Sequence, residues 1–143
     1  MLYHLYTDGG ARGNPGPAGI GVVIQDTEGN SLDTLGAYIG HATNNQAEYR
    51  ALITGLGRIA DLTKAKIQTS VEVYLDSELL VKQLTGEYRV KNKQLKPLYE
   101  KVQKMTREFK SVSFAYTPRA GNREADRLVN RAIDAELGKR AGP

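Results

Sequence analysis

Hydrophobic and polar residues follow two different periods along the chain, and each period predicts one kind of element. Alternation of single residues, with many β-branched and aromatic side chains, predicts strands near residues 2–8, 18–25, 31–40, 70–76 and 112–116. Apolar residues spaced three and four apart predict helices near residues 43–60, 78–84, 95–109 and 122–137. Three antiparallel strands therefore come first, and the later strands alternate with helices. This order is typical of an α/β domain with a mixed sheet.

The periodic pattern continues to Leu137 without a linker, an internal repeat or a low-complexity segment. We therefore expect one domain over residues 1–137 and a disordered tail over residues 138–143, where the periodicity ends. The chain begins directly as a strand, without the basic and apolar segments of a signal peptide, and no apolar run is long enough to span a membrane. The expectation is a monomeric, cytoplasmic protein that has no membrane partner.

The composition narrows the chemistry that the protein can perform. It contains no cysteine, which excludes disulfides and thiolate-bound metals, and His4 and His41 are too few for a histidine-rich zinc site. The net charge of +4 is unevenly distributed, because residues 82–110 carry nine Lys/Arg and only three Glu. Such a segment is typical of a surface that binds a polyanion, but the solvated face of an amphipathic helix carries similar charge. Charge alone leaves both interpretations open.

The first predicted strand ends on a carboxylate that is followed by a glycine-rich loop. Asp8 precedes Gly9 and Gly10, and the loop contains two hydrogen-bond donors, Arg12 and Asn14. Glycines let a loop turn tightly and let a ligand approach the backbone. One interpretation is a corner that binds a metal and a phosphate. The other is an ordinary Asp-Gly hairpin turn between two strands.

Three further acids occupy comparable positions in the predicted fold. Asp76 ends the fourth strand, and Glu48 and Asp126 lie in the first turns of two helices. Each also has an ordinary structural explanation, because Asp is a common N-cap and an acid compensates the dipole at a helix N-terminus. If the four acids converge, they form a site of oxygen ligands only, which suits Mg²⁺ or Mn²⁺. Two such cations are what in-line displacement at a phosphodiester uses.

Four motifs give the chain, over residues 2–137, a resemblance to type 1 ribonuclease H. They are Tyr-Thr-Asp-Gly-Gly around Asp8, Thr-Asn-Asn-Gln-Ala-Glu up to Glu48, Asp-Ser at Asp76, and Asn-Arg-Glu-Ala-Asp up to Asp126. The resemblance implies a ribonuclease H-like fold, in which three antiparallel and two parallel strands form one mixed sheet flanked by helices. It makes the four acids a catalytic, metal-binding tetrad that holds two Mg²⁺ ions once substrate is bound, with Mn²⁺ as a substitute. The implied reaction is hydrolysis of the RNA strand of an RNA–DNA hybrid, leaving 5′-phosphate and 3′-hydroxyl ends.

The same resemblance implies which residues meet the substrate. Polar side chains are expected in the minor groove of the hybrid, where 2′-hydroxyl groups distinguish RNA from DNA. Thr43, with Asn14 and a basic neighbour, is expected to hold a phosphate of the DNA strand, although Thr43 and Gln46 also fit a helix capping box. The expected substrate-contacting residues are Gly10, Arg12, Asn14, Thr43, Asn44, Asn45, Gln46, Ser77 and Asn122.

Two features depart from the pattern that is common among bacterial members of this family. The loop before the last helix carries Arg119 and no histidine. With a pKa above about 12, an arginine cannot act as a general base, but it can bind the scissile phosphate or the leaving group; the alternative is a surface arginine without that role. The basic protrusion of many members shrinks here to residues 86–93, whose basic side chains are expected to supply part of the grip on the hybrid.

Two other functions are compatible with parts of this pattern. One is another nuclease of the same superfamily, such as a junction resolvase or a transposase-like domain. The match through Asn14 and Asn45 disfavours it. The other is a non-catalytic module that binds hybrid or duplex RNA, which the complete set of four acids disfavours. The expected partner is an RNA–DNA hybrid, and duplex RNA is kept as a second candidate.

Overall fold

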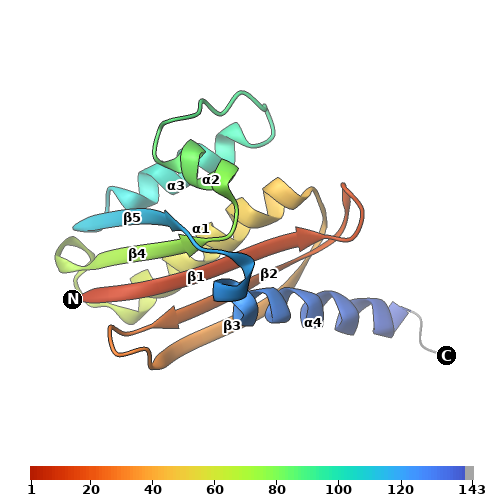
Figure 1. Ribbon diagram of the computed structural model, residues 1–143, viewed down its shortest axis with the longest axis horizontal. Helices are drawn as coiled ribbons and strands as arrows, with labels where there is room; N and C mark the ends of the chain where they lie inside the picture. Colours follow the sequence, from red (N-terminus) through yellow and green to blue (C-terminus); the bar gives the residue numbers. More distant parts are fainter. Residues whose placement is uncertain (141–143) are drawn as a thin grey trace.

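The computed structural model describes residues 1–140, and its centre is a five-stranded sheet. Strands β1 and β2 form a hairpin that β3 extends, whereas β4 and β5 run parallel to β1, so the strand order is β3-β2-β1-β4-β5 (Figure 1). This arrangement confirms the predicted sheet of three antiparallel and two parallel strands. The strands are β1 (Leu2–Ala11), β2 (Gly16–Gln25), β3 (Ser31–Ala42), β4 (Ser70–Leu75) and β5 (Ser111–Tyr116).

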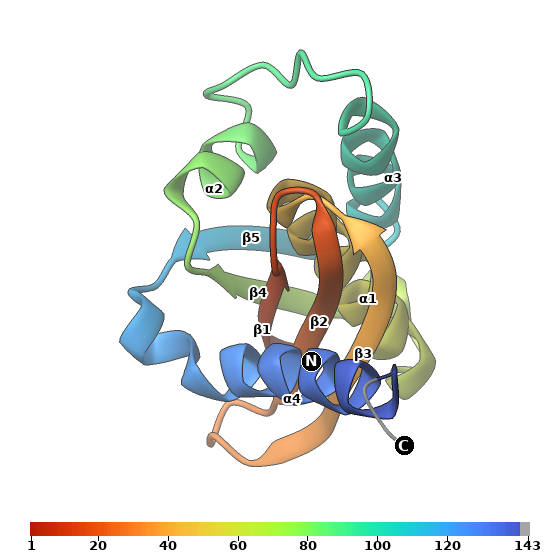
Figure 2. The ribbon, with the colours of Figure 1, turned by 90° about the vertical axis from the view of Figure 1, so that its right-hand side faces the viewer.

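Helices cover both faces of the sheet. On one face α1 packs on β1 and β2, with α3 beside it; on the other, α4 packs on β2 and β3 (Figures 1 and 2). The short helix α2 follows β4, and two 3₁₀ turns, η1 and η2, complete the elements. The helical elements are α1 (Asn44–Leu62), η1 (Lys66–Gln68), α2 (Glu78–Leu84), α3 (Lys96–Thr106), η2 (Arg119–Asn122) and α4 (Arg123–Arg140).

The main core lies between the sheet and α1. Leu52, Leu56 and Ile59 form the apolar stripe that the helical period predicts, and they are fully buried against the sheet residues Leu5 and Val73. The predicted capping box starts this helix, because Thr43 and Gln46 exchange side chain-to-backbone hydrogen bonds. Helix α1 is therefore fixed both at its N-terminus and along its length.

Close backbone contacts bring both helix layers down onto the sheet. A Cβ atom on Gly9 would overlap the backbone of Ala47 in α1, and one on Gly21 would overlap the carbonyl of Ala125 in α4. A side chain at either strand position would therefore push a helix away. The glycines let the N-terminal turns of α1 and α4 approach the sheet near Asp8.

The ends of several elements differ from the sequence-based prediction. The predicted first strand ends at Asp8, but β1 continues to Ala11, since Gly9 and Gly10 pair with Ile20 and Gly19 of β2. Residues 138–140 belong to α4 and not to a disordered tail, and the rest of the predicted tail, residues 141–143, lies outside the described residues. Within residues 1–140, no helix has the length and apolarity needed to cross a bilayer.

Candidate active site

Three of the four predicted acids converge at one edge of the sheet. Asp8 lies on β1 two residues beyond the last pair that β1 forms with β4, and Asp76 directly follows β4. Glu48 comes from the first turns of α1, which Gly9 allows to cross close by. Carboxylate oxygens of Asp8, Glu48 and Asp76 all lie within 4.8 Å of one another. The fold thus gathers acids that are up to 68 residues apart in the sequence.

The fourth acid, Asp126, reaches the same place from the opposite face of the sheet. It lies in the first turn of α4, and its carboxyl group is within hydrogen-bonding reach of Asp8. Asp8, Glu48, Asp76 and Asp126 line one open cleft, and Arg119 of η2 lines the same cleft. Arg12 lines it as well, so the cleft combines four carboxyl groups with two guanidinium groups.

The acids raise one another's proton affinity. Burial, with added repulsion from Asp76, Asp126 and Glu48, raises the pKa of Asp8 to about 8. Burial and repulsion from Asp76 raise the pKa of Glu48 to about 7, although a hydrogen bond from Ser77 opposes the rise. Two unit charges about 4 Å apart repel by roughly 4 kcal/mol at an effective dielectric near 20. The cluster therefore needs protons or cations to offset its charge.

The donor set fits a divalent cation. It offers carboxylate oxygens only, in a compact group, and raised pKa values show that the free carboxylates are destabilised here. Hard cations such as Mg²⁺ and Mn²⁺ prefer oxygen ligands of this kind, whereas zinc sites usually include imidazole or thiolate. Asp8, Glu48 and Asp76 could hold such an ion, and Asp126 is near enough to Asp8 to share in it.

Several predicted substrate contacts gather in a second hollow beside the cleft. Asn14, Thr43 and Asn45 line it together with Asn92 and Gln94 of the connector between α2 and α3. The last two residues carry no recognisable motif, so the sequence analysis missed them. Their amides add hydrogen-bonding capacity to the hollow.

Other predicted contacts already have partners within the protein. The Asn44 side chain accepts a hydrogen bond from Ala11 N, and Asn44 N donates to Asn14 Oδ1. Gln46 accepts from Thr43 N, and its Nε2 atom lies 3.4 Å from Oε1 of Gln94. These residues shape the rim of the cleft and the hollow.

Ser77 and Gly10 both lie in the cleft. Ser77 Oγ accepts a hydrogen bond from Leu80 N as the N-cap of α2, and its hydroxyl group donates to Glu48. A Cβ atom on Gly10 would be 3.7 Å from Val129, so α4 lies directly over this glycine. Ser77 thus orients a candidate metal ligand, and Gly10 forms part of the cleft floor.

Two further residues that the sequence predicts to contact the substrate, Asn122 and Arg12, make contacts within the protein. Asn122 is 2% exposed and its Nδ2 atom donates to the carbonyl oxygen of Thr7, so its side chain ties η2 to β1 beside Asp8. The buried amide therefore holds η2 against β1. The guanidinium group of Arg12 points to α4, where it forms an ion pair with Asp134.

Comparisons with known proteins agree with this geometry. A family model described as "Reverse transcriptase-like" matches residues 6–132. A bifunctional protein of Mycobacterium tuberculosis is 43% identical over 94% of the chain, and a ribonuclease HI of Halobacterium salinarum is 40% identical over 92%. The chain spans 36% of the first relative and 64% of the second. A ribonuclease H of Coxiella burnetii is 31% identical, and the match covers 95% of the chain and 92% of that relative.

Solved structures give the same result. LC11-RNase H1, isolated from compost by a metagenomic approach, has a TM-score of 0.91 and is 49% identical, with 95% of this chain and 98% of that chain covered. The same protein in complex with an RNA/DNA hybrid has a TM-score of 0.90. The mixed sheet and its acidic cleft thus define a ribonuclease H-like protein. More narrowly, the chain belongs to the type 1 ribonuclease H family.

Proposed function

We propose that this protein is a metal-dependent endoribonuclease that hydrolyses the RNA strand of RNA–DNA hybrids, leaving 5′-phosphate and 3′-hydroxyl ends. The observation that carries the proposal is the convergence of Asp8, Glu48 and Asp76, with Asp126 beside Asp8, in an open cleft. The relative that is solved with an RNA/DNA hybrid supports the choice of substrate, because it matches this chain at 48% identity over 94% of its length.

The four acids would hold two Mg²⁺ ions when substrate is bound, with Mn²⁺ as a substitute. Bound divalent ions supply Lewis acidity, which favours attack by water and stabilises the leaving oxygen. The protein's own contribution is to hold four carboxylates in one place before substrate arrives, so that little reorganisation is needed at the moment of reaction. Ser77 assists by donating a hydrogen bond to Glu48.

Arg119 contributes positive charge to the cleft. It is an exposed residue of η2 and lines the cleft. The other described arginine that lines the cleft, Arg12, forms an ion pair with Asp134. A guanidinium group donates hydrogen bonds in a planar fork that matches a phosphate, but it cannot remove a proton at neutral pH. We assign Arg119 to binding the scissile phosphate or the leaving group.

The hollow formed by Asn14, Thr43 and Asn45 suits the recognition of the duplex outside the cleft. Its amide and hydroxyl groups can donate to phosphate oxygens and to the 2′-hydroxyl groups of an A-like minor groove. The neighbouring connector adds positive charge through Arg89, Lys91 and Lys93. These groups would position the hybrid, whereas the acidic cleft would act on one strand.

A cleavage assay tests the proposal directly. End-labelled RNA–DNA hybrid, duplex RNA, duplex DNA and branched DNA are each incubated with the metal-free protein, to which Mg²⁺ or Mn²⁺ is then added. We expect metal-dependent cuts in the RNA strand of the hybrid. Cleavage of duplex DNA or of branched DNA instead would favour another nuclease of the superfamily, and binding without cleavage would favour a non-catalytic module. Cleavage of duplex RNA beside the hybrid would show that the protein accepts a second substrate.

A further inference from the structure

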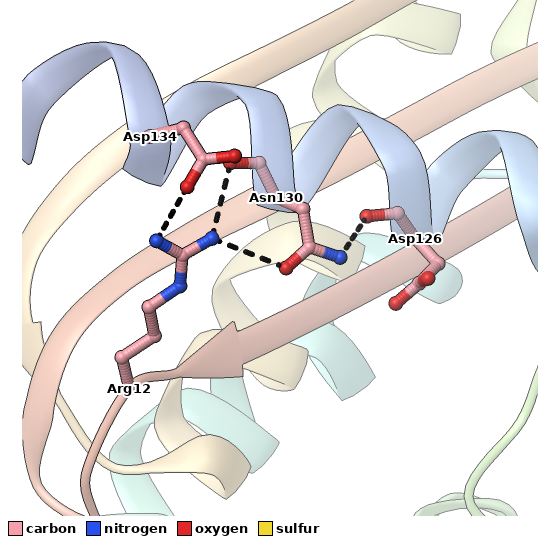
Figure 3. Close-up of polar contacts among 4 residues, drawn as sticks. All are labelled: Arg12, Asp126, Asn130 and Asp134. Carbon is pink, nitrogen blue, oxygen red and sulfur yellow. Dashed lines mark hydrogen bonds and ion pairs between the residues drawn. The ribbon is translucent and has the colours of Figure 1, made fainter. Parts of the chain in front are cut away.

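Arg12 leaves the loop between β1 and β2 and reaches the last helix, α4 (Figure 3). Its Nη1 atom lies 2.5 Å from Oδ1 of Asp134, and its Nη2 atom lies 3.4 Å from both the carbonyl oxygen and Oδ1 of Asn130. Both terminal nitrogens of the guanidinium group are therefore directed at α4. These charge-assisted contacts hold the guanidinium group on α4, at the wall of the acidic cleft.

The Asn130 side chain continues this contact towards the acidic cluster (Figure 3). Its Nδ2 atom donates to the backbone carbonyl of Asp126, one helical turn earlier, at 3.0 Å. Because Oδ1 accepts from Arg12 while Nδ2 donates to Asp126, the two contacts fix the orientation of the amide. Asp126 in turn faces Asp8. A continuous series of contacts thus runs from the loop to the candidate metal ligands.

The packing of α4 explains why such contacts are needed. The helix rests on β2 and β3 through glycines: a Cβ on Gly19 would be 3.1 Å from Val129 O, and one on Gly36 would be 2.8 Å from Leu128 O. Glycines bring the backbones close together, but they provide few side chains to interdigitate with the helix. Such a contact fixes the distance between α4 and the sheet, but it resists a shift of α4 along the strands less strongly. Directional polar contacts can set that position.

The loop that carries Arg12 is itself anchored on its other side. Ala11 N donates to Asn44 Oδ1 at 2.8 Å, and Asn44 N donates to Asn14 Oδ1 at 3.0 Å. Asn44 is the first residue of α1, the helix that carries Glu48. The loop therefore connects the two helices that bring Glu48 and Asp126 to opposite sides of Asp8.

We propose that Arg12 is a positioning residue, which acts with Asp134 and Asn130 to hold α4 at the place where Asp126 faces Asp8. This assignment replaces the substrate contact that the sequence predicts for Arg12. The expected effect of this contact on hybrid cleavage rests on the proposed function, whereas its expected effect on metal affinity does not.

The first test needs no substrate. Mn²⁺ is titrated into the metal-free protein and followed by electron paramagnetic resonance for the wild type, Arg12→Ala, Asp134→Ala and the control Arg131→Ala. Arg131 is an exposed residue of α4 that has no ion pair among residues 1–140. We expect the Arg12 and Asp134 variants to bind Mn²⁺ up to about tenfold more weakly, because loss of a direct partner of a metal ligand costs about 10–100-fold and these residues act on Asp126 through Asn130. Unchanged affinity in both variants overturns the proposal.

The second test separates positioning from substrate contact. On a labelled hybrid, Arg12→Ala and Asp134→Ala should each lower kcat by about tenfold while KM stays within about twofold. The double variant should be no worse than either single variant, because both remove the same contact. A raised KM in Arg12→Ala alone, with Asp134→Ala like the wild type, overturns the proposal and returns Arg12 to the substrate.

Two further variants keep the tests decisive if an alanine variant folds poorly. Arg12→Lys retains the charge and should recover part of the Mn²⁺ affinity, and the exchanged pair Arg12→Asp with Asp134→Arg should recover more than either half alone. If neither variant recovers Mn²⁺ affinity, the ion pair between Arg12 and Asp134 is not the reason why the alanine variants bind Mn²⁺ weakly. If the wild type does not cleave the hybrid, the proposed function fails, but the Mn²⁺ titration still tests the position of α4.

Discussion

Asp126 faces Asp8 across the contact between α4 and β1, and the two carboxyl groups are within hydrogen-bonding reach of each other. One comes from the first strand and the other from the last helix, so the site is complete only when the ends of the domain have packed together. Asp76 and Glu48 then meet Asp8 from its other sides. Asp8 is thus the residue that all three other acids adjoin.

This central position predicts the effect of Asp8→Asn. The variant keeps the size of the side chain but removes a charge that Asp76, Asp126 and Glu48 all repel. We expect cleavage of the hybrid to be abolished, because a neutral amide is a poor ligand for a hard cation. Folding should be retained, with an unfolding midpoint of the metal-free protein at pH 8.5 no lower than that of the wild type. Turnover like that of the wild type would remove Asp8 from the proposed site.

The raised pKa values of Asp8 and Glu48 predict how stability depends on pH. In the folded state the pKa of Asp8 is about 8 and that of Glu48 about 7, whereas their ordinary values are 3.8 and 4.5. At a pH between the ordinary and the raised pKa, each group therefore binds more protons in the folded state than in the unfolded state. The free energy of unfolding of the metal-free protein should therefore fall as pH rises from about 4 to about 8, by on the order of a few kcal/mol. Urea denaturation at pH 5 and pH 8.5 measures this difference.

Metal addition provides the matching control. Mg²⁺ competes with protons for the same carboxylates, so it should raise the unfolding midpoint more at pH 8.5 than at pH 5. In the double variant Asp8→Asn with Glu48→Gln, both the pH dependence and the effect of Mg²⁺ should shrink. An undiminished response in that variant would place the titrating groups elsewhere.

Arg119→Ala tests the assignment of the cleft arginine. Arg119 lines the cleft with the acids, so its loss should weaken stabilisation of the charge that develops during reaction. We expect kcat to fall by at least about tenfold while hybrid affinity changes by less, since many other contacts hold the duplex. Steady-state kinetics and a binding titration in Ca²⁺ measure the two effects. Arg131→Ala is the control. If Arg119→Ala has the same kcat and KM as this control, Arg119 is an ordinary surface residue.

The sequence is sufficient to locate the four acids because each lies in a motif whose neighbours define a strand end or a helix start. Asp76 is an example, since β4 ends at Leu75, one residue before the predicted end, and α2 begins at Glu78 as predicted, although Ser77 and not Asp76 is its N-cap. The first strand is different. Gly9 and Gly10 read as strand breakers, but β1 continues through them, and Gly9 is required because α1 crosses it. That requirement arises from tertiary packing and leaves no local pattern.

Arg12 and Asn122 show what local patterns cannot reveal. Both are polar loop residues, which is why a substrate contact is the natural prediction for each. Their partners are distant: Asn130 is 118 residues from Arg12, and Thr7 is 115 residues from Asn122. No periodicity within one segment encodes such a contact, so its existence follows only from the assembled fold.

Two glycines of α1 provide a matched test of the packing that supports the site. A Cβ atom on Gly55 would lie 2.8 Å from Leu5 Cδ1 and 3.2 Å from Thr7 Cγ2, directly beneath the strand that carries Asp8. Leu5 is fully buried and cannot move aside freely. On Gly57, two residues further along the same helix, the nearest atom would be Met105 Cε at 4.0 Å.

The two alanine substitutions should therefore have opposite effects. Gly57→Ala should stabilise the protein by roughly 0.5–1 kcal/mol, because alanine restricts the unfolded chain and favours a helix. Gly55→Ala gains the same helix preference but overpacks the core, at a cost of about 1–3 kcal/mol, so its net effect should be destabilising. Urea denaturation of both variants in the same buffer gives the comparison. If Gly55→Ala proved as stable as Gly57→Ala, α1 would have to be free to shift away from β1, and the close approach that brings Glu48 to Asp8 would not be fixed by this contact.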